Sequence, residues 1–147
     1  MNIQYIELEG KIIDDYAIKL LNLKNEIFTK GNDEFVNKIN IFDKKDLYSV
    51  FAFSKDELVG YKIGYATETT TFYSWLGGVH PSFRKNGIAS TLFKIQHERC
   101  FKKGYEFITT QSSNKYKEMM RLNLKFGFEI YGIKMSDNIQ ILFRKNL

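Results

Sequence analysis

The sequence predicts an α/β (α+β) fold with a mixed, mostly antiparallel sheet of six to seven strands flanked by helices. Three strand-like runs follow one another between Leu47 and Val79, which is typical of an antiparallel meander. The order strand, helix, strand from Thr71 to Gln111 indicates a right-handed crossover, so those two strands should be parallel. A chain of 147 residues can bury one core, and we expect a single domain over residues 1–147.

Hydrophobic periodicity predicts the elements of the N-terminal half. Asn2–Leu8 has enough alternation for a strand, and Asp14–Thr29 carries apolar residues on one face of a helix. Asp33 is a favourable N-cap for a second, shorter helix that reaches Phe42. The three runs of the meander are Leu47–Phe53, Leu58–Ala66 and Thr71–Val79.

Glycines divide the C-terminal half into its elements. A helix of about 17 residues begins near Gly87 and ends at Gly104, and a second helix ends at Gly127. The elements after Gly104 are the strand Tyr105–Gln111, the helix Lys115–Phe126 and the strands Phe128–Lys134 and Ile139–Lys145.

Composition narrows the classes of function. An apolar share of 44%, with thirteen Phe and nine Tyr, predicts a packed core and argues against disorder. Cys100 is the only cysteine, and no leader or long apolar run is present, so we expect a cytoplasmic protein without a membrane partner. The net charge of +5 favours anionic partners. It does not choose among nucleic acid, an acidic protein and a phosphate-bearing ligand, because no run of basic residues occurs.

The loop after the third strand of the meander has the features of an anion site. The first turn of the following helix leaves backbone N–H groups without partners and carries the positive end of the helix dipole. Gly87 and Ala89 leave the backbone accessible there, while Arg84 and Lys85 add cationic donors. Backbone geometry alone also explains a glycine at such a turn. The preceding pair Gly77-Gly78 weakens a strand and favours the close approach of a ligand.

Two motifs resemble the GNAT superfamily, the GCN5-related N-acetyltransferases. Arg84-x-x-Gly87-x-Ala89 resembles the acetyl-CoA signature Gln/Arg-x-x-Gly-x-Gly/Ala, and Met119–Phe128 resembles the family's C-terminal helix followed by Gly-Phe. The order of elements is similar over essentially the whole chain. The resemblance implies the acyl-CoA N-acyltransferase fold, whose sheet splays into a V between Thr71–Val79 and Tyr105–Gln111 and holds pantetheine in the gap.

The resemblance also implies which residues bind the coenzyme. Backbone groups at Gly78 and Val79 would pair with the pantetheine amides. Asn114, just after the second strand of the V, is either a further contact or the N-cap of the next helix. The segment under the pyrophosphate would consist of Arg84, Lys85, Asn86, Gly87, Ile88, Ala89 and Ser90.

Transfer to an amine calls for a base. A lysine-like amine with a pKa of about 10.4 is protonated at neutral pH, and the reaction needs it neutral. The candidates are Glu68, in the loop before the active strand, and Tyr73, where some family members place a catalytic carboxylate. Glu68 is otherwise a solvated loop residue. Tyr73, which shares a face with Trp75, is otherwise a wall of the acceptor pocket or part of the core.

The departing thiolate is the second catalytic problem. Many family members protonate it with a tyrosine in the last helix, in the context Leu-Tyr-x-x-x-Gly-Phe, and Asn123 stands at that position here. An amide can hydrogen-bond a thiolate but cannot protonate it. With a thiol pKa near 8.5, the thiolate is a tolerable leaving group without a proton, and Tyr116 is the fallback donor.

We therefore expect direct transfer of an acetyl group from acetyl-CoA to a primary amine, by a monomer or a homodimer. Cys100 is expected to be an inert core thiol, and His80 and His97 lack companions at metal-ligand spacing, so neither a covalent cysteine nor a metal is predicted. The alternative is a CoA-binding regulatory module with little or no turnover, which Asn123 favours. Nucleic acid is not an expected partner, because only the charge supports it.

Overall fold

The computed structural model describes residues 1–28 and 44–147, and the predicted helix from Asp33 to Phe42 lies outside them. The described helices are α1 (Asp14–Ile27), α3 (Ile88–Lys103) and α4 (Lys117–Lys125), with a 3₁₀ turn, Pro81–Phe83, before α3. The strands are β1 (Ile3–Glu9), β2 (Tyr48–Ser54), β3 (Glu57–Ala66), β4 (Thr71–Val79), β5 (Phe107–Ser113), β6 (Glu129–Met135) and β7 (Ile139–Asn146).

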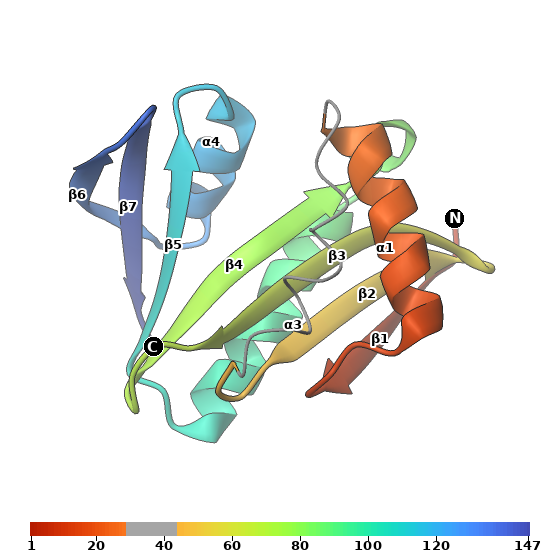
Figure 1. Cartoon of the computed structure of the whole chain (residues 1–147), viewed down its shortest axis with the longest axis horizontal. Helices are drawn as coiled ribbons and strands as arrows, with labels where there is room; N and C mark the ends of the chain where they lie inside the picture. Colours follow the sequence, from red (N-terminus) through yellow and green to blue (C-terminus); the bar gives the residue numbers. More distant parts are fainter. Residues whose placement is uncertain (29–43) are drawn as a thin grey trace.

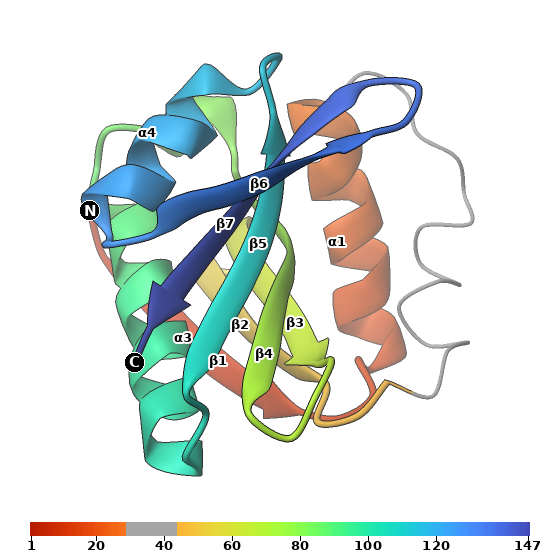
Figure 2. The ribbon, with the colours of Figure 1, turned by 90° about the vertical axis from the view of Figure 1, so that its left-hand side faces the viewer.

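The strands form one sheet in the order β1-β2-β3-β4-β5-β7-β6, which confirms the predicted mixed sheet. All neighbouring pairs are antiparallel except β4 and β5, which are parallel and joined by α3, as the crossover predicts. Helices α3 and α4 lie on one face of the sheet and α1 lies on the other (Figure 2). Each face therefore buries its own hydrophobic cluster.

The two parallel strands separate soon after they meet. They pair only from Thr71–Tyr73 to Phe107–Thr109, and one further bond follows, in which the Thr110 hydroxyl donates to the Ser74 carbonyl at 2.9 Å. Beyond it β4 and β5 diverge (Figure 1). The V predicted from the family resemblance is therefore present, and the edge of β4 from Trp75 onward is not covered by β5.

A β-bulge marks the same point on the other edge of β4. Ile63 and Gly64 of β3 face Leu76 and Ser74 of β4, so Trp75 is an extra residue without a partner in β3. A bulge bends its strand and increases the local twist. The bend therefore begins where β4 parts from β5.

Two boundaries of the C-terminal half lie two residues later than predicted. The Tyr105 amide donates to the Cys100 carbonyl at 3.1 Å, which is the hydrogen bonding of a helix end, so β5 cannot begin at Tyr105. Helix α4 begins at Lys117 with Tyr116 at its N-cap and without a side-chain cap. Asn114 therefore does not cap this helix, and that alternative from the sequence is wrong.

Candidate active site

The start of α3 is open to a ligand. Its N-cap, Gly87, has φ +77°, and no side chain caps the helix. The first helical hydrogen bond runs from the Thr91 amide to the Gly87 carbonyl at 3.0 Å, so the amides of the preceding first turn remain available. A Cβ added at Gly87 would meet nothing within 4 Å. This geometry fits a phosphate group.

Side chains of the loop before α3 have two different roles. The Asn86 side-chain amide donates to the Phe83 carbonyl at 3.2 Å and to the Arg84 carbonyl at 3.1 Å, so Asn86 braces the loop. The Arg84 Nε donates to the Val79 carbonyl at 3.2 Å, which fastens the loop to the end of β4. Within the described chain, the terminal nitrogens of Arg84 make no hydrogen bond to protein, and the Lys85 side chain is exposed. Both cations remain at the helix start.

Packing within the protein, and not only a ligand, requires glycine at the end of β4. A Cβ at Gly78 would lie 2.9 Å from the Ile27 side chain and 3.3 Å from the Tyr61 ring. The absence of a side chain at Gly78 therefore allows the end of α1 to pack against β4. At Gly77 the atoms nearest to an added Cβ are the Tyr61 carbonyl oxygen at 3.5 Å and two side-chain atoms of Lys62 at 3.8 and 3.9 Å.

His80 is not isolated, contrary to the expectation from the sequence. Its Nε2 pairs with the Glu26 carboxylate of α1, and its Nδ1 accepts from the Ser82 amide at 3.0 Å. These contacts join α1 to the loop after β4. Glu26 is 54 positions away in the chain, so spacing in the sequence gave no indication of the pair.

Aromatic side chains gather on the α1 face of the sheet beside the bulge. Tyr65 contacts the rings of Tyr73 and Trp75 at centroid distances of 5.6 Å each. The Lys44 ammonium lies 4.1 Å from the centre of the Tyr65 ring and 4.5 Å from that of Trp75. The group of rings therefore already holds one cation. Burial raises the pKa of Tyr73 to about 12, so its phenol stays neutral and is a poor base.

Glu68 lies at the opposite end of β4 from the helix start. Its amide and carbonyl bond to Thr71, the first residue of β4 and one of those paired with β5. The side chain is exposed. Because the V is closed at this end, the geometry does not favour Glu68 as the base.

The residues predicted around the departing thiolate lie in different settings. Asn123 on α4 is 1% exposed, and its Nδ2 has no hydrogen-bond partner. Tyr116 is 42% exposed, with its ring edge-on to Phe28 at the end of α1. It precedes Asn123 by seven positions, about two helical turns. The exposed Asn114 accepts a bond from Lys117 through its backbone. The structure does not bring these three side chains together.

A group of basic residues on the α3 face was missed by the sequence argument. This basic cluster consists of Lys62 on β3, His97 on α3 and Lys145 on β7. Lys145 Nζ lies 3.0 Å from His97 Nδ1, and burial lowers the pKa of His97 to about 3. His97 is therefore a neutral acceptor, not an isolated residue. Lys62, a charge inside the apolar run Leu58–Ala66, was the one available signal.

The remaining reactive groups have structural roles. Cys100 is buried, and burial raises the pKa of its thiol to about 12, which agrees with an inert core thiol. Within residues 1–28 and 44–147, no group of His, Cys, Asp or Glu side chains is arranged to hold a metal ion. In the same residues, no helix combines the length and the apolarity needed to cross a membrane.

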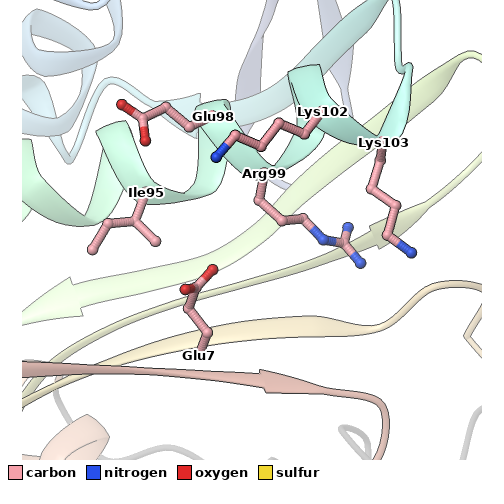
Figure 3. Close-up of a pocket in the computed structure, with 6 residues that line it drawn as sticks. All are labelled: Glu7, Ile95, Glu98, Arg99, Lys102 and Lys103. Atoms are coloured by element: carbon pink, nitrogen blue, oxygen red, sulfur yellow. The ribbon is translucent and has the colours of Figure 1, made fainter.

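A hollow of about 400 Å³ lies between β1 and the second half of α3, away from the helix start. Its lining consists of Glu7, Ile95, Glu98, Arg99, Lys102 and Lys103 (Figure 3). Arg99, 8% exposed, makes two hydrogen bonds to each of Glu9 and Asp46, over 2.6 to 3.3 Å. Tyr105 also donates to Asp46. This ion-pair network joins β1, α3 and the segment before β2, and its charges are mutually satisfied.

Comparison with solved structures shows the same fold. A GNAT-family protein of Desulfovibrio desulfuricans matches with a TM-score of 0.82 and 16% identity, over 97% of this chain and 99% of that one. A GNAT acetyltransferase of Elizabethkingia anophelis, with acetyl-CoA bound, matches at 0.73 and 17%, over 99% of both chains. The PaiA N-acetyltransferase of Thermoplasma acidophilum, in complex with coenzyme A, matches at 0.79 and 14%, over 100% of both.

Among proteins of curated function, none matches this sequence. The family model for the acetyltransferase (GNAT) family matches residues 17–128, which include the start of α3, β5 and α4. The V between β4 and β5 and the open helix start are thus found in the part of the chain that the family model describes. The chain belongs to the GNAT family of acetyltransferases and is an acyltransferase.

Proposed function

We propose that this acetyltransferase binds acetyl-CoA in the V and passes the acetyl group directly to a primary amine. The observation that carries the proposal is the uncapped start of α3 at the open end of β4. The pyrophosphate would accept hydrogen bonds from the amides of Gly87–Ser90, with Arg84 and Lys85 nearby. The pantetheine arm would follow the uncovered edge of β4. The solved structures with acetyl-CoA and coenzyme A support this assignment.

The proposed acceptor site is the opposite, α1 face of the bulge. Tyr65 and Trp75 hold the Lys44 ammonium there, which supports binding of a ligand with a protonated amine. Because Tyr73 stays neutral and Glu68 is distant from the open part of the V, we assign loss of the amine proton to water. The buried Cys100 thiol cannot form an acyl intermediate, which favours direct transfer over a covalent relay.

The test separates binding from turnover. Acetyl-CoA should raise the melting temperature at concentrations above its Kd, and a panel of polyamines, amino acids, aminoglycosides and peptides should contain an acceptor that releases free coenzyme A thiol. Binding without turnover across the panel would favour the regulatory module, which the amide at Asn123 supports. No shift with millimolar acetyl-CoA would contradict both. The cytoplasmic location and the monomeric or homodimeric state stay predictions of the sequence.

A further inference from the structure

Lys62 is a buried cation that pairs with no carboxylate of the described residues. Its side chain is 6% exposed, and within the described chain no acceptor or carboxylate bonds its Nζ. Its ammonium lies over the face of Phe93, 3.9 Å from the ring centre. Burial lowers the pKa of this amine to about 7. A desolvated ammonium costs free energy unless an anion offsets it.

The ammonium lies under the uncovered part of β4. Lys62 is paired with Gly77, and its Nζ is 3.9 Å from the position that a Cβ on Gly77 would take. Because Gly77 has no side chain, the lysine reaches the α3 face of β4 beyond the point where β5 has diverged. Lys62 therefore lies on the α3 face of the sheet, beside the part of β4 that β5 does not cover.

Lys62 lies nearer to the closed end of the V than the helix start does. Phe93, which the ammonium contacts, is five residues beyond Ile88 and so about 7.5 Å further along α3. Phe93 also stacks on Phe126 at a centroid distance of 4.9 Å, and Phe126 lies at the end of the helix that carries Asn123. If the pyrophosphate lies at the helix start, the inner end of the pantetheine arm, with its sulfur, extends toward this region.

Among residues 1–28 and 44–147, none supplies an anion to Lys62 at neutral pH. The titratable groups facing it are His97 and Cys100 of α3, with Lys145 of β7 bonded to His97. Burial lowers the pKa of His97 to about 3 and raises that of Cys100 to about 12, so both are neutral, and Lys145 is a second base. The surroundings therefore favour an anion that arrives with a ligand.

We propose that Lys62 is a catalytic residue that pairs with the coenzyme A thiolate and protonates it as it departs. The inference rests on the proposed function. When the tetrahedral intermediate collapses, the C–S bond breaks and its electron pair goes to sulfur. Sulfur takes a proton from the Lys62 ammonium, giving coenzyme A thiol and a neutral amine. The acceptor nitrogen, bound as an ammonium, loses one proton to water before it attacks and a second one afterwards. Lys62 regains one proton from water, so the net reaction releases one proton.

This assignment accounts for the amide on α4. Asn123 can donate a hydrogen bond to sulfur but no proton, and its unpartnered Nδ2 is suited to that lesser role. An ammonium can supply the proton and also stabilise the thiolate, because a neighbouring lysine lowers a thiol pKa. Lys62 would thus take over the function that a tyrosine at position 123 performs in many family members.

The test is the pKa of the bound thiol, which requires no acceptor. Coenzyme A bound to wild type, Lys62→Met and Lys145→Met is titrated by the ultraviolet absorbance of the thiolate. In wild type the thiol pKa should be at least about one unit lower than in Lys62→Met, a tenfold difference. Lys145→Met, which removes the partnered lysine of the basic cluster, should behave like wild type.

Any other outcome of this titration would contradict the inference. Equal thiol pKa values in wild type and Lys62→Met, with binding intact, would overturn it and leave the proposed function standing. The same rise of the thiol pKa in Lys145→Met would show that any nearby positive charge lowers this pKa, and it would also overturn the inference. Failure of the wild type to bind coenzyme A would overturn both proposals.

A wild-type experiment covers the case in which Lys62→Met does not fold. In protein with ¹³C-labelled lysine, the pKa of Lys62 is measured by NMR in complexes with coenzyme A and with S-methyl-coenzyme A, whose thioether cannot become a thiolate. The pKa should be higher, by about one unit or more, with coenzyme A. Equal values in the two complexes would overturn the inference.

Discussion

Two buried cations on the α3 face of the sheet have opposite surroundings. Arg99 and Lys62 are 8% and 6% exposed. Arg99 makes four hydrogen bonds to the carboxylates of Glu9 and Asp46. Lys62 has an aromatic ring and two neutral side chains around it, and none of the described carboxylates bonds to it.

The difference separates a structural charge from one that is available to a ligand. The Arg99 network holds together segments that are far apart in sequence, and its donors are used by the protein. Lys62 costs folding free energy in the absence of a ligand and lies beside the part of β4 that β5 does not cover. The hollow at Arg99 is therefore a weaker functional candidate than the V between β4 and β5, although more charged side chains line it.

The largest effect is expected from removing the paired cation. Arg99→Met removes the guanidinium that donates to Glu9 and Asp46 and leaves Asp46 with the Tyr105 hydroxyl as a hydrogen-bond donor. The expected loss is about 3 kcal/mol of unfolding free energy, at the low end for a broken buried ion pair because Glu9 is largely exposed. Urea denaturation measures it, with the exposed neighbour Lys102→Met as the control. A loss below about 1 kcal/mol would show that the network is not structural.

Removing Lys62 should change the unfolding free energy in the opposite direction. Lys62→Met should raise the unfolding free energy at pH 7 by about 1 to 3 kcal/mol, because a buried charge is replaced by an apolar chain of similar length. The folded-state pKa of about 7 lies below the unfolded value of about 10.4. Between these values the unfolded wild type binds more protons, so its stability rises with pH.

Denaturation at pH 7 and pH 9 tests this sign. The advantage of Lys62→Met should shrink at about pH 9, where the folded wild-type amine is neutral. A variant that is less stable than wild type at both pH values would mean that the Lys62 ammonium is stabilised by a contact of the folded protein.

The two glycines at the ends of α3 allow an effect on ligand binding to be separated from an effect on stability. Gly87 and Gly104 have φ values of +77° and +90°, and an added Cβ meets nothing within 4 Å at either. Alanine at each should cost a similar 1 to 2 kcal/mol or so of stability. Only Gly87→Ala should also weaken acetyl-CoA binding, by about tenfold or 1.4 kcal/mol, as measured by calorimetry. Equal affinities in the two variants would remove the pyrophosphate from the start of α3.

The smallest effect is expected from the substitution of Tyr116, the fallback proton donor. Tyr116 is exposed and packs edge-on against Phe28, outside the basic cluster. Tyr116→Phe should change kcat by less than about threefold, whereas loss of a general acid costs about a hundredfold or more. The profile of kcat against pH, with an acceptor from the amine panel, measures this. A hundredfold loss with the alkaline limb gone would assign the proton transfer to Tyr116.

The fold and the helix-start site could be predicted because both depend on local pattern. Within the described residues, every strand and helix lies within two residues of its predicted bounds, and the conformation of Gly87 follows from its place before an apolar helix. The shift of β5 arose because Tyr105 belongs to the end of α3. That choice is made by hydrogen bonds to Cys100, which the apolar pattern does not report.

Contacts between distant segments could not be predicted in this way. His97 and Lys145 come together across 48 positions, and Arg99 and Glu9 across 90. A lysine in a strand and a histidine in a helix are each ordinary in sequence. Only the folded structure shows that, among the described residues, no carboxylate pairs with Lys62 and two pair with Arg99.

The position of the coenzyme is the central claim, and amide mapping tests it most directly. Addition of acetyl-CoA to ¹⁵N-labelled protein should shift the amides of Gly87–Ser90 and Gly77–Val79 most, because these would line the pyrophosphate and the pantetheine arm. The Arg99 side-chain Nε–H and the Lys102 amide should change little. The largest changes around the Arg99 hollow, or no changes at saturating acetyl-CoA, would contradict the account.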